Sequence, residues 1–134
     1  MGLFRTLNIN EGVRLYASTP GAVLVDVREA GEYAEGHIPG SVNLSPDGFR
    51  TPEDVLPDPS RPLFLYCYTG IRSARAAKFL AAKGYQNVTN IGGLIRYRGP
   101  LERNHFTVDL SRYMEDVSLA NETMQKYFRR WFNY

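Results

Sequence analysis

The chain has 134 residues, of which 43% are hydrophobic and 22% are charged, and its formal net charge is +2. These values fit one globular domain with a core of its own, the charge is too small to favour a nucleic-acid partner, and no apolar stretch approaches the roughly 20 residues that span a membrane. A single cysteine excludes an internal disulfide, so we expect a reduced thiol in a cytoplasmic protein, with no secretory signal at the start.

Short segments of alternating type follow one another along the first hundred residues. The apolar runs are continuous, as in strands buried on both faces, and each is followed by a helical or glycine-rich stretch. Asn10 is the expected N-cap of the first helix, and residues 46–62, with five of the eight prolines, are expected to form a loop with one helical turn. Strands are predicted at 22–27, 41–44, 63–66 and 88–91, and helices at 10–17, 29–35 and 72–83.

This alternation predicts an α/β fold. We expect a central parallel sheet of about five short strands with helices on both faces, plus an extra C-terminal helix. Ligands of such sheets bind beyond the carboxyl ends of the strands, and Cys67 stands at one such end.

Residues 101–134 differ in character and are predicted to be a C-terminal helical extension of a domain spanning residues 1–100. They hold 7 of the 17 aromatic residues. An apolar stripe with helical spacing predicts a helix from about 111 to 130, which could pack on the domain or form a homodimer through residues 111–132. Membrane attachment is the weaker alternative because only two basic residues are adjacent. The stripe consists of Val117, Ala120, Met124, Tyr127 and Trp131.

The segment around Cys67 has the most chemical content. A lone cysteine after an apolar strand is usually a small core residue. Here, however, a tight turn with Gly70 and a helix start follow directly, so the thiol is expected at a helix N-terminus, where free N–H groups and the helix dipole stabilise an anion. Arg72 adds a full positive charge, so we expect a depressed pKa for Cys67. Ser73 is placed to cap the helix or to donate to a bound anion.

Three segments in this order resemble the signatures of the single-domain rhodanese-like sulfurtransferases. The resemblance covers roughly residues 8–100, and Tyr97 stands where many members have Trp. The segments are 24–29 with 32–33 and 36–41, then 67–73, and then 84–85 with Val88, Ile91, 92–93 and 99–100.

The resemblance implies transfer of sulfane sulfur, from a small donor anion such as thiosulfate or from a persulfide, to a thiol or protein acceptor. Cys67 would be the nucleophile and would carry the sulfur as a persulfide. Four residues separate Cys67 from Arg72, whereas related phosphatases have five between their cysteine and arginine. The shorter loop suits attack on sulfur better than attack on phosphate. The substrate-binding residues would be Tyr68, Thr69, Gly70, Ile71, Arg72 and Ser73.

Other residues have supporting roles in this interpretation. Asp26 and Arg28 would brace the active-site loop, His37 would be structural, and Gly92-Gly93 would permit close backbone approach beside the site. We expect no metal, because no Cys/His cluster has ligand spacing, and no cofactor, nucleic acid or membrane. The alternatives are a non-catalytic binding or regulatory module and, less favoured, a phosphatase or arsenate reductase.

Overall fold

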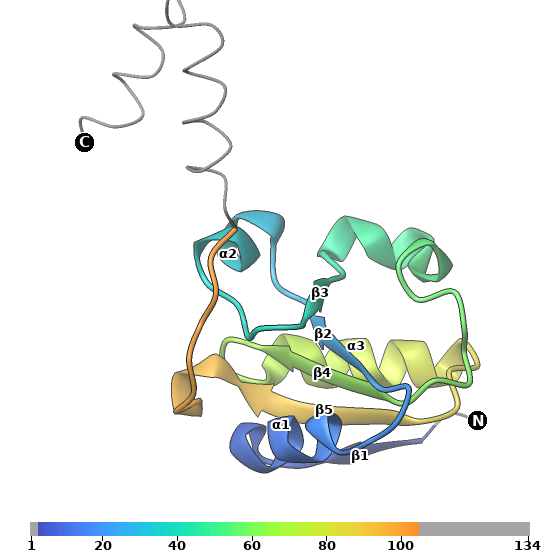
Figure 1. Cartoon of the computed structure of the whole chain (residues 1–134). Helices are drawn as coiled ribbons and strands as arrows, with labels where there is room; N and C mark the ends of the chain where they lie inside the picture. The colour runs from blue at the N-terminus through green and yellow to red at the C-terminus, as the bar shows by residue number, and fades with distance from the viewer. Residues whose placement is uncertain (1–2, 105–134) are drawn as a thin grey trace, which may run out of the picture. The chain divides into compact units, whose positions relative to one another are not determined.

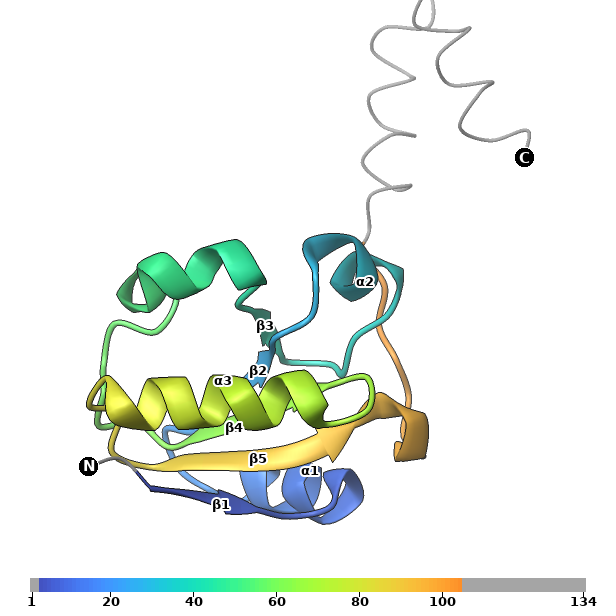
Figure 2. The ribbon, with the colours of Figure 1, turned by 180° about the vertical axis from the view of Figure 1, so that it is seen from behind.

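The computed structural model describes residues 3–104, which form an α/β fold around one five-stranded sheet. All strand pairs are parallel, and the strand order is β1-β5-β4-β2-β3. Helix α1 covers one face of the sheet and α3 the other (Figures 1 and 2), which confirms the predicted fold class. In chain order the elements are β1 (Phe4–Thr6), α1 (Ile9–Ala17), β2 (Val23–Asp26), α2 (Ala30–Glu35), β3 (Val42–Asn43), 3₁₀ helices at Pro46–Arg50 and Pro52–Asp54, β4 (Leu63–Cys67), α3 (Ile71–Ala82), β5 (Val88–Gly93) and a 3₁₀ helix at Leu94–Arg96.

Strand β4 lies at the centre of the sheet, and all five of its residues are buried. Its side chains alternate between two hydrophobic clusters, as the two-residue period of a strand requires. Leu65 and Cys67 join the cluster under α3, with Ala77 and Leu80. Phe64 and Tyr66 join the opposite cluster, under α1. The cysteine therefore points toward the helix that follows it in sequence.

The start of α1 corrects one sequence prediction. The helix begins at Ile9, and its N-cap is Asn8 instead of Asn10, with the Asn8 side chain accepting a hydrogen bond of 3.0 Å from the Glu11 backbone N–H. The side chain of Asn10 has another use. It donates to the Arg96 carbonyl and accepts from the Arg98 backbone N–H, so that it ties α1 to the segment after β5.

Strand β1 and the loop before β4 also differ from the prediction. Residues 4–6 form an edge strand beside β5 that the sequence pattern did not predict. A strand of three residues is too short to show a periodic pattern. The proline-rich segment 46–62 contains two 3₁₀ helices instead of one helical turn, each with a proline in its first turn, where the missing N–H costs nothing.

Internal contacts divide the chain into two units, Met1–Arg103 and Asn104–Tyr134. The helix predicted from about 111 to 130, and with it the homodimer through residues 111–132, lies outside the described residues. The domain boundary at residue 100 likewise stays a prediction. Among the described helices, none is long and apolar enough to cross a membrane.

Two helical glycines allow a test of the packing between α1 and the sheet. A Cβ at Gly12 would overlap the Ile91 side chain, whereas a Cβ at Gly31 in α2 would meet nothing within 4 Å. We expect Gly12→Ala to lower the free energy of unfolding by about 1–3 kcal/mol through overpacking, although alanine is the better helix former. Gly31→Ala should raise it by about 0.5 kcal/mol. Urea denaturation with an unchanged m-value measures both, and stabilisation by Gly12→Ala would contradict the packing described here.

Candidate active site

Cys67 stands where β4 ends and the chain turns into α3. It pairs with Gly93 of β5 after an irregularity in register between Leu65 and Cys67, of the kind that re-aims a side chain at a strand end. The turn ends at Gly70, which is the N-cap of α3 and has a φ of +101°. Glycine adopts this left-handed conformation without strain, so Gly70 allows the helix to begin directly beside the sulfur.

Three donors converge on the Cys67 Sγ atom. The Gly70 backbone N–H donates at 2.9 Å, and the Ser73 backbone N–H and hydroxyl both lie at 3.4 Å. These main-chain groups belong to the first turn of α3, where helix N–H groups have no partner inside the helix. The sequence predicted this arrangement of a thiol at a helix N-terminus, and the geometry agrees with it.

Two opposing effects act on the thiol. The Cys67 side chain is fully buried, and burial raises its pKa. The hydrogen bonds from Ser73 and Gly70, with a smaller contribution from the Thr69 backbone, together outweigh burial and hold the pKa of Cys67 below its ordinary value. Thiolate is the nucleophilic form of cysteine. The site therefore favours the reactive species although it excludes water.

The active-site loop lies directly on the backbone of β5. A Cβ at Gly93 would overlap the Tyr68 carbonyl oxygen and would come within 2.6 Å of the Thr69 Cα atom, and a Cβ at Gly70 would come within 3.1 Å of the Gly92 Cα atom. The Ile95 backbone N–H also donates to the Tyr68 carbonyl at 3.0 Å. The prediction that Gly92-Gly93 permits close backbone approach is thus confirmed.

Asp26 and Arg28 form a buried ion pair at the end of β2, with 2.8 Å between Asp26 Oδ2 and Arg28 Nη2. The same guanidinium donates to the Gly36 carbonyl at 2.6 Å, and the Asn43 amide donates to the carbonyls of both residues. These bonds fix the turn after β2 and the end of α2. Within residues 3–104 no hydrogen bond from this pair reaches the loop 68–73, so its bracing of that loop stays a prediction.

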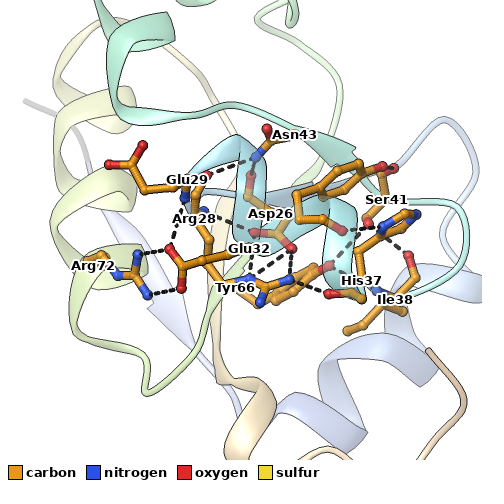
Figure 3. A network of polar contacts seen from close by, with 12 residues as sticks. Asp26, Arg28, Glu29, Glu32, His37, Ile38, Ser41, Asn43, Tyr66 and Arg72 are labelled. Atoms are coloured by element: carbon orange, nitrogen blue, oxygen red, sulfur yellow. Dashed lines mark hydrogen bonds and ion pairs between the residues drawn. The ribbon is translucent and has the colours of Figure 1, made fainter. Parts of the chain in front are cut away.

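The structure adds Glu32 to the residues around the site. Its carboxylate makes a two-pronged contact with Arg72, with Nη1–Oε1 at 2.7 Å and Nη2–Oε2 at 3.1 Å. Figure 3 shows this pair at one end of the polar network around Asp26 and Arg28. Glu32 belongs to a segment that carries the family resemblance, but only the fold brings it to Arg72, 40 residues further along the chain.

Arg72 therefore lies at the rim of the site instead of in contact with the sulfur. The hydrogen bonds that Arg72 donates to Glu32 raise the pKa of Arg72, and the charge of Cys67 raises it further by a smaller amount. The guanidinium is thus within electrostatic range of the thiolate. Among the other predicted substrate-binding residues, Thr69 is exposed, and Tyr68 and Ile71 are 47% and 63% exposed.

A pocket of about 470 Å³ opens beside Tyr68. Its walls combine apolar side chains of two later segments with charged side chains from the β2–α2 region. The lining residues are Arg28, Glu32, Glu35, Gly36, Tyr68, Leu94 and Leu101.

His37 and Tyr66 have structural roles. The His37 ring stacks on Tyr33 with 3.8 Å between ring centroids, and its Nδ1 atom lies 2.8 Å from the Tyr33 carbonyl oxygen, to which it donates. The Tyr66 hydroxyl accepts from the Ile38 backbone N–H and contacts the Ser41 hydroxyl (Figure 3). Burial raises the pKa of Tyr66, so this hydroxyl stays protonated. Both residues hold the turn 37–41, away from the sulfur.

The pH dependence of Cys67 alkylation tests the donors around the sulfur. The rate of alkylation by iodoacetamide is proportional to the fraction of Cys67 present as thiolate. It is therefore maximal above the pKa of Cys67 and falls as the pH drops through that pKa. The wild-type midpoint should lie below that of a free thiol. Ser73→Ala removes a hydroxyl donor and should move the midpoint to higher pH. The shift should be partial, because the same hydroxyl also lies 3.1 Å from the Gly70 carbonyl and both backbone N–H donors remain.

Ser45→Ala is the matched control, since the Ser45 side chain makes no capping hydrogen bond and lies outside the loop. Its midpoint should equal that of the wild type. A wild-type midpoint at or above that of a free thiol would contradict the balance between burial and hydrogen bonding.

Comparison with known proteins agrees with this geometry. The model of the family described as "Rhodanese-like domain" matches residues 11–96. The chain is 31% identical over 93 residues to the thiosulfate sulfurtransferase GlpE of Shewanella oneidensis, covering 69% of this chain and 90% of that protein. Among solved structures, a rhodanese from E. coli determined with anions superposes with a TM-score of 0.57 and 27% identity, covering 62% of this chain and 99% of that chain.

Other relatives are much longer than this chain. A tRNA sulfurtransferase of Desulfurococcus amylolyticus is 39% identical over 88 residues, which are 64% of this chain but 17% of that protein. A tRNA uridine(34) hydroxylase of Synechococcus elongatus is 31% identical over 111 residues, which are 77% of this chain and 41% of that protein. The names of the relatives support sulfurtransferase activity at the level of the family. With the family model matched over most of the described residues, the chain belongs to the rhodanese-like domain family.

Proposed function

We propose that this protein is a sulfurtransferase that carries sulfane sulfur as a persulfide on Cys67. The observation that carries the proposal is the convergence of the Gly70 and Ser73 backbone N–H groups and the Ser73 hydroxyl on one buried sulfur atom. The names of the relatives, thiosulfate sulfurtransferase and thiosulfate:glutathione sulfurtransferase among them, support the same chemistry.

The reaction has two displacement steps. In the first, the Cys67 thiolate attacks the outer sulfur of thiosulfate, a sulfur–sulfur bond forms, the bond to the sulfonate sulfur breaks, and sulfite leaves with the electron pair. In the second, an acceptor thiolate attacks the outer sulfur of the persulfide and the Cys67 thiolate is regenerated. No external oxidant or reductant is needed, and charge is conserved in both steps. The route is covalent, ping-pong catalysis.

The residues of the loop support the anionic states of this cycle. The amides that open α3 are fixed in place, so they stabilise thiolate and persulfide without reorganisation. The spacing of four residues between Cys67 and Arg72 keeps the ring of donors short, which suits a sulfur atom better than a tetrahedral phosphate and disfavours a phosphatase or arsenate reductase. We propose a small sulfur-donor anion as one substrate and a thiol or protein as acceptor, without a cofactor and in the cytoplasm.

One observation favours a second candidate. The Cys67 side chain has no exposed surface, as expected of a binding or regulatory module whose cysteine does no chemistry. For the proposed enzyme, the same observation means that a donor reaches Sγ only when the residues that cover it move. The two candidates differ in whether Cys67 becomes a persulfide.

Intact-mass measurement separates these candidates. We expect the reduced protein to gain the mass of one sulfur atom after incubation with thiosulfate, and to lose it on addition of cyanide. Cys67→Ser should gain nothing, because the hydroxyl is a far weaker nucleophile than the thiolate. Ser45→Ala should behave like the wild type. Absence of the mass gain, both with thiosulfate and with a small-molecule persulfide, would overturn the proposal in favour of the non-catalytic module.

A further inference from the structure

The contact between Glu32 and Arg72 joins α2 to the first turn of α3, the helix whose N-terminus faces Cys67. Glu32 comes from α2, and Arg72 is the second residue of α3, five residues after the cysteine. The Nη1 and Nη2 atoms of Arg72 each donate to one carboxylate oxygen of Glu32, at 2.7 and 3.1 Å. The two side chains are 41% and 36% exposed, so water and dissolved anions can compete for both charges.

The charges around the site cancel in pairs. Arg28 is paired with Asp26, and Arg72 is paired with Glu32. Neither pair includes the thiolate of Cys67 or the carboxylate of Glu35, which lines the pocket beside Tyr68, so in the described part of the chain both negative charges lack an ion-pair partner. An anionic donor that approaches Cys67 therefore meets a negative site unless Arg72 is released from Glu32.

We propose that Glu32 is a positioning residue that sets the charge selectivity of the site, by competing with anionic substrates for the Arg72 guanidinium. This inference rests on the proposed function for its substrate class, the sulfur-donor anions. A half-exposed ion pair is weak, about fivefold at most in an equilibrium constant, so a donor anion can displace the Glu32 carboxylate. Neutral reagents gain nothing from the guanidinium that is released, and Glu32 therefore discriminates between donors by charge and not by size.

The substitution Glu32→Gln removes the charge of this side chain and keeps its contact within α2. Glu32 also accepts a hydrogen bond of 3.1 Å from the Glu29 backbone N–H at the start of α2. Glutamine makes the same contact in such a capping box, so α2 should form as before. In the variant, Arg72 loses its charged partner while the shape of the rim is kept. The KM for thiosulfate should fall about twofold to fivefold, the range that an exposed ion pair supports, with little change in kcat.

The decisive test uses two alkylating reagents of similar size on Cys67 and needs no sulfur transfer. Iodoacetate is an anion and iodoacetamide is neutral. The ratio of their rates cancels any change in the thiolate fraction, because both reagents consume the same thiolate. We expect the iodoacetate-to-iodoacetamide ratio to rise about twofold to fivefold in Glu32→Gln.

Glu35→Gln provides the matched control. Glu35 lies one turn further along α2 and lines the same pocket, but within residues 3–104 it forms no ion pair. Its substitution removes the same charge without releasing Arg72, so the ratio should change by clearly less. An equal rise in both variants would reduce the effect to general charge and would overturn the inference, as would an unchanged ratio in Glu32→Gln.

A double variant shows whether Glu32 acts through Arg72. In the background of Arg72→Ala, Glu32→Gln should change the ratio no more than Glu35→Gln does, because the guanidinium for which anions compete is gone. A full rise in that background would assign the effect to Glu32 alone. The alkylation ratio and the mass gain with thiosulfate are independent readouts. An unchanged alkylation ratio together with a normal mass gain would contradict only the role of Glu32 in charge selectivity. A changed alkylation ratio without a mass gain would contradict only the proposed sulfurtransferase activity.

Discussion

The site depends on one competition at the end of β4, between the burial of a sulfur atom and the hydrogen bonds aimed at it. A cysteine in an apolar interior is an inert core residue with a raised pKa. Here the sulfur belongs to the cluster under α3, yet the first turn of α3 directs its N–H groups at it. Because these groups have no partners within the helix, the thiolate satisfies donors that would otherwise be buried and unpaired. The helix start and the anion stabilise each other.

This geometry requires that two stretches of backbone touch. The loop 68–70 can curl over the sulfur only if it lies on β5, and the contact leaves no room for a side chain at Gly93. The loop is thus supported by main-chain atoms, through the contact with Gly93 and the hydrogen bond from Ile95 to Tyr68. Main-chain support leaves Tyr68 and Ile71 free to point outward, so these side chains can vary in character without a change in the cradle.

The parts of the site that could be predicted from the sequence are those set by local order along the chain. A buried strand, a cysteine, a glycine turn and a helix start specify where the sulfur lies relative to the helix, and the Gly92-Gly93 pair signalled the backbone contact. The parts that could not be predicted depend on tertiary distance. The Glu32–Arg72 pair spans 40 residues, and charged residues on a surface have many possible partners. The N-cap of α1 was predicted wrongly at Asn10, because the residue type alone does not separate Asn10 from Asn8 and only the hydrogen bonds to Arg96 and Arg98 show what Asn10 does instead.

Consecutive residues of β4 divide two tasks between the faces of the sheet. Tyr66 points to the α1 face and holds the turn 37–41 through its hydroxyl, while Cys67 points to the α3 face. The sheet separates these two polar sites, so a side chain on one face cannot brace the other directly. The connection runs around the strand ends instead. Arg28 binds Gly36 at the end of α2, and Glu32 of the same helix reaches Arg72 on the far side. If the buried Asp26–Arg28 pair braces the active-site loop, as predicted, this route through the position of α2 is the one along which it would act. The half-exposed ion pair at the end of the route is the part that a substrate can open.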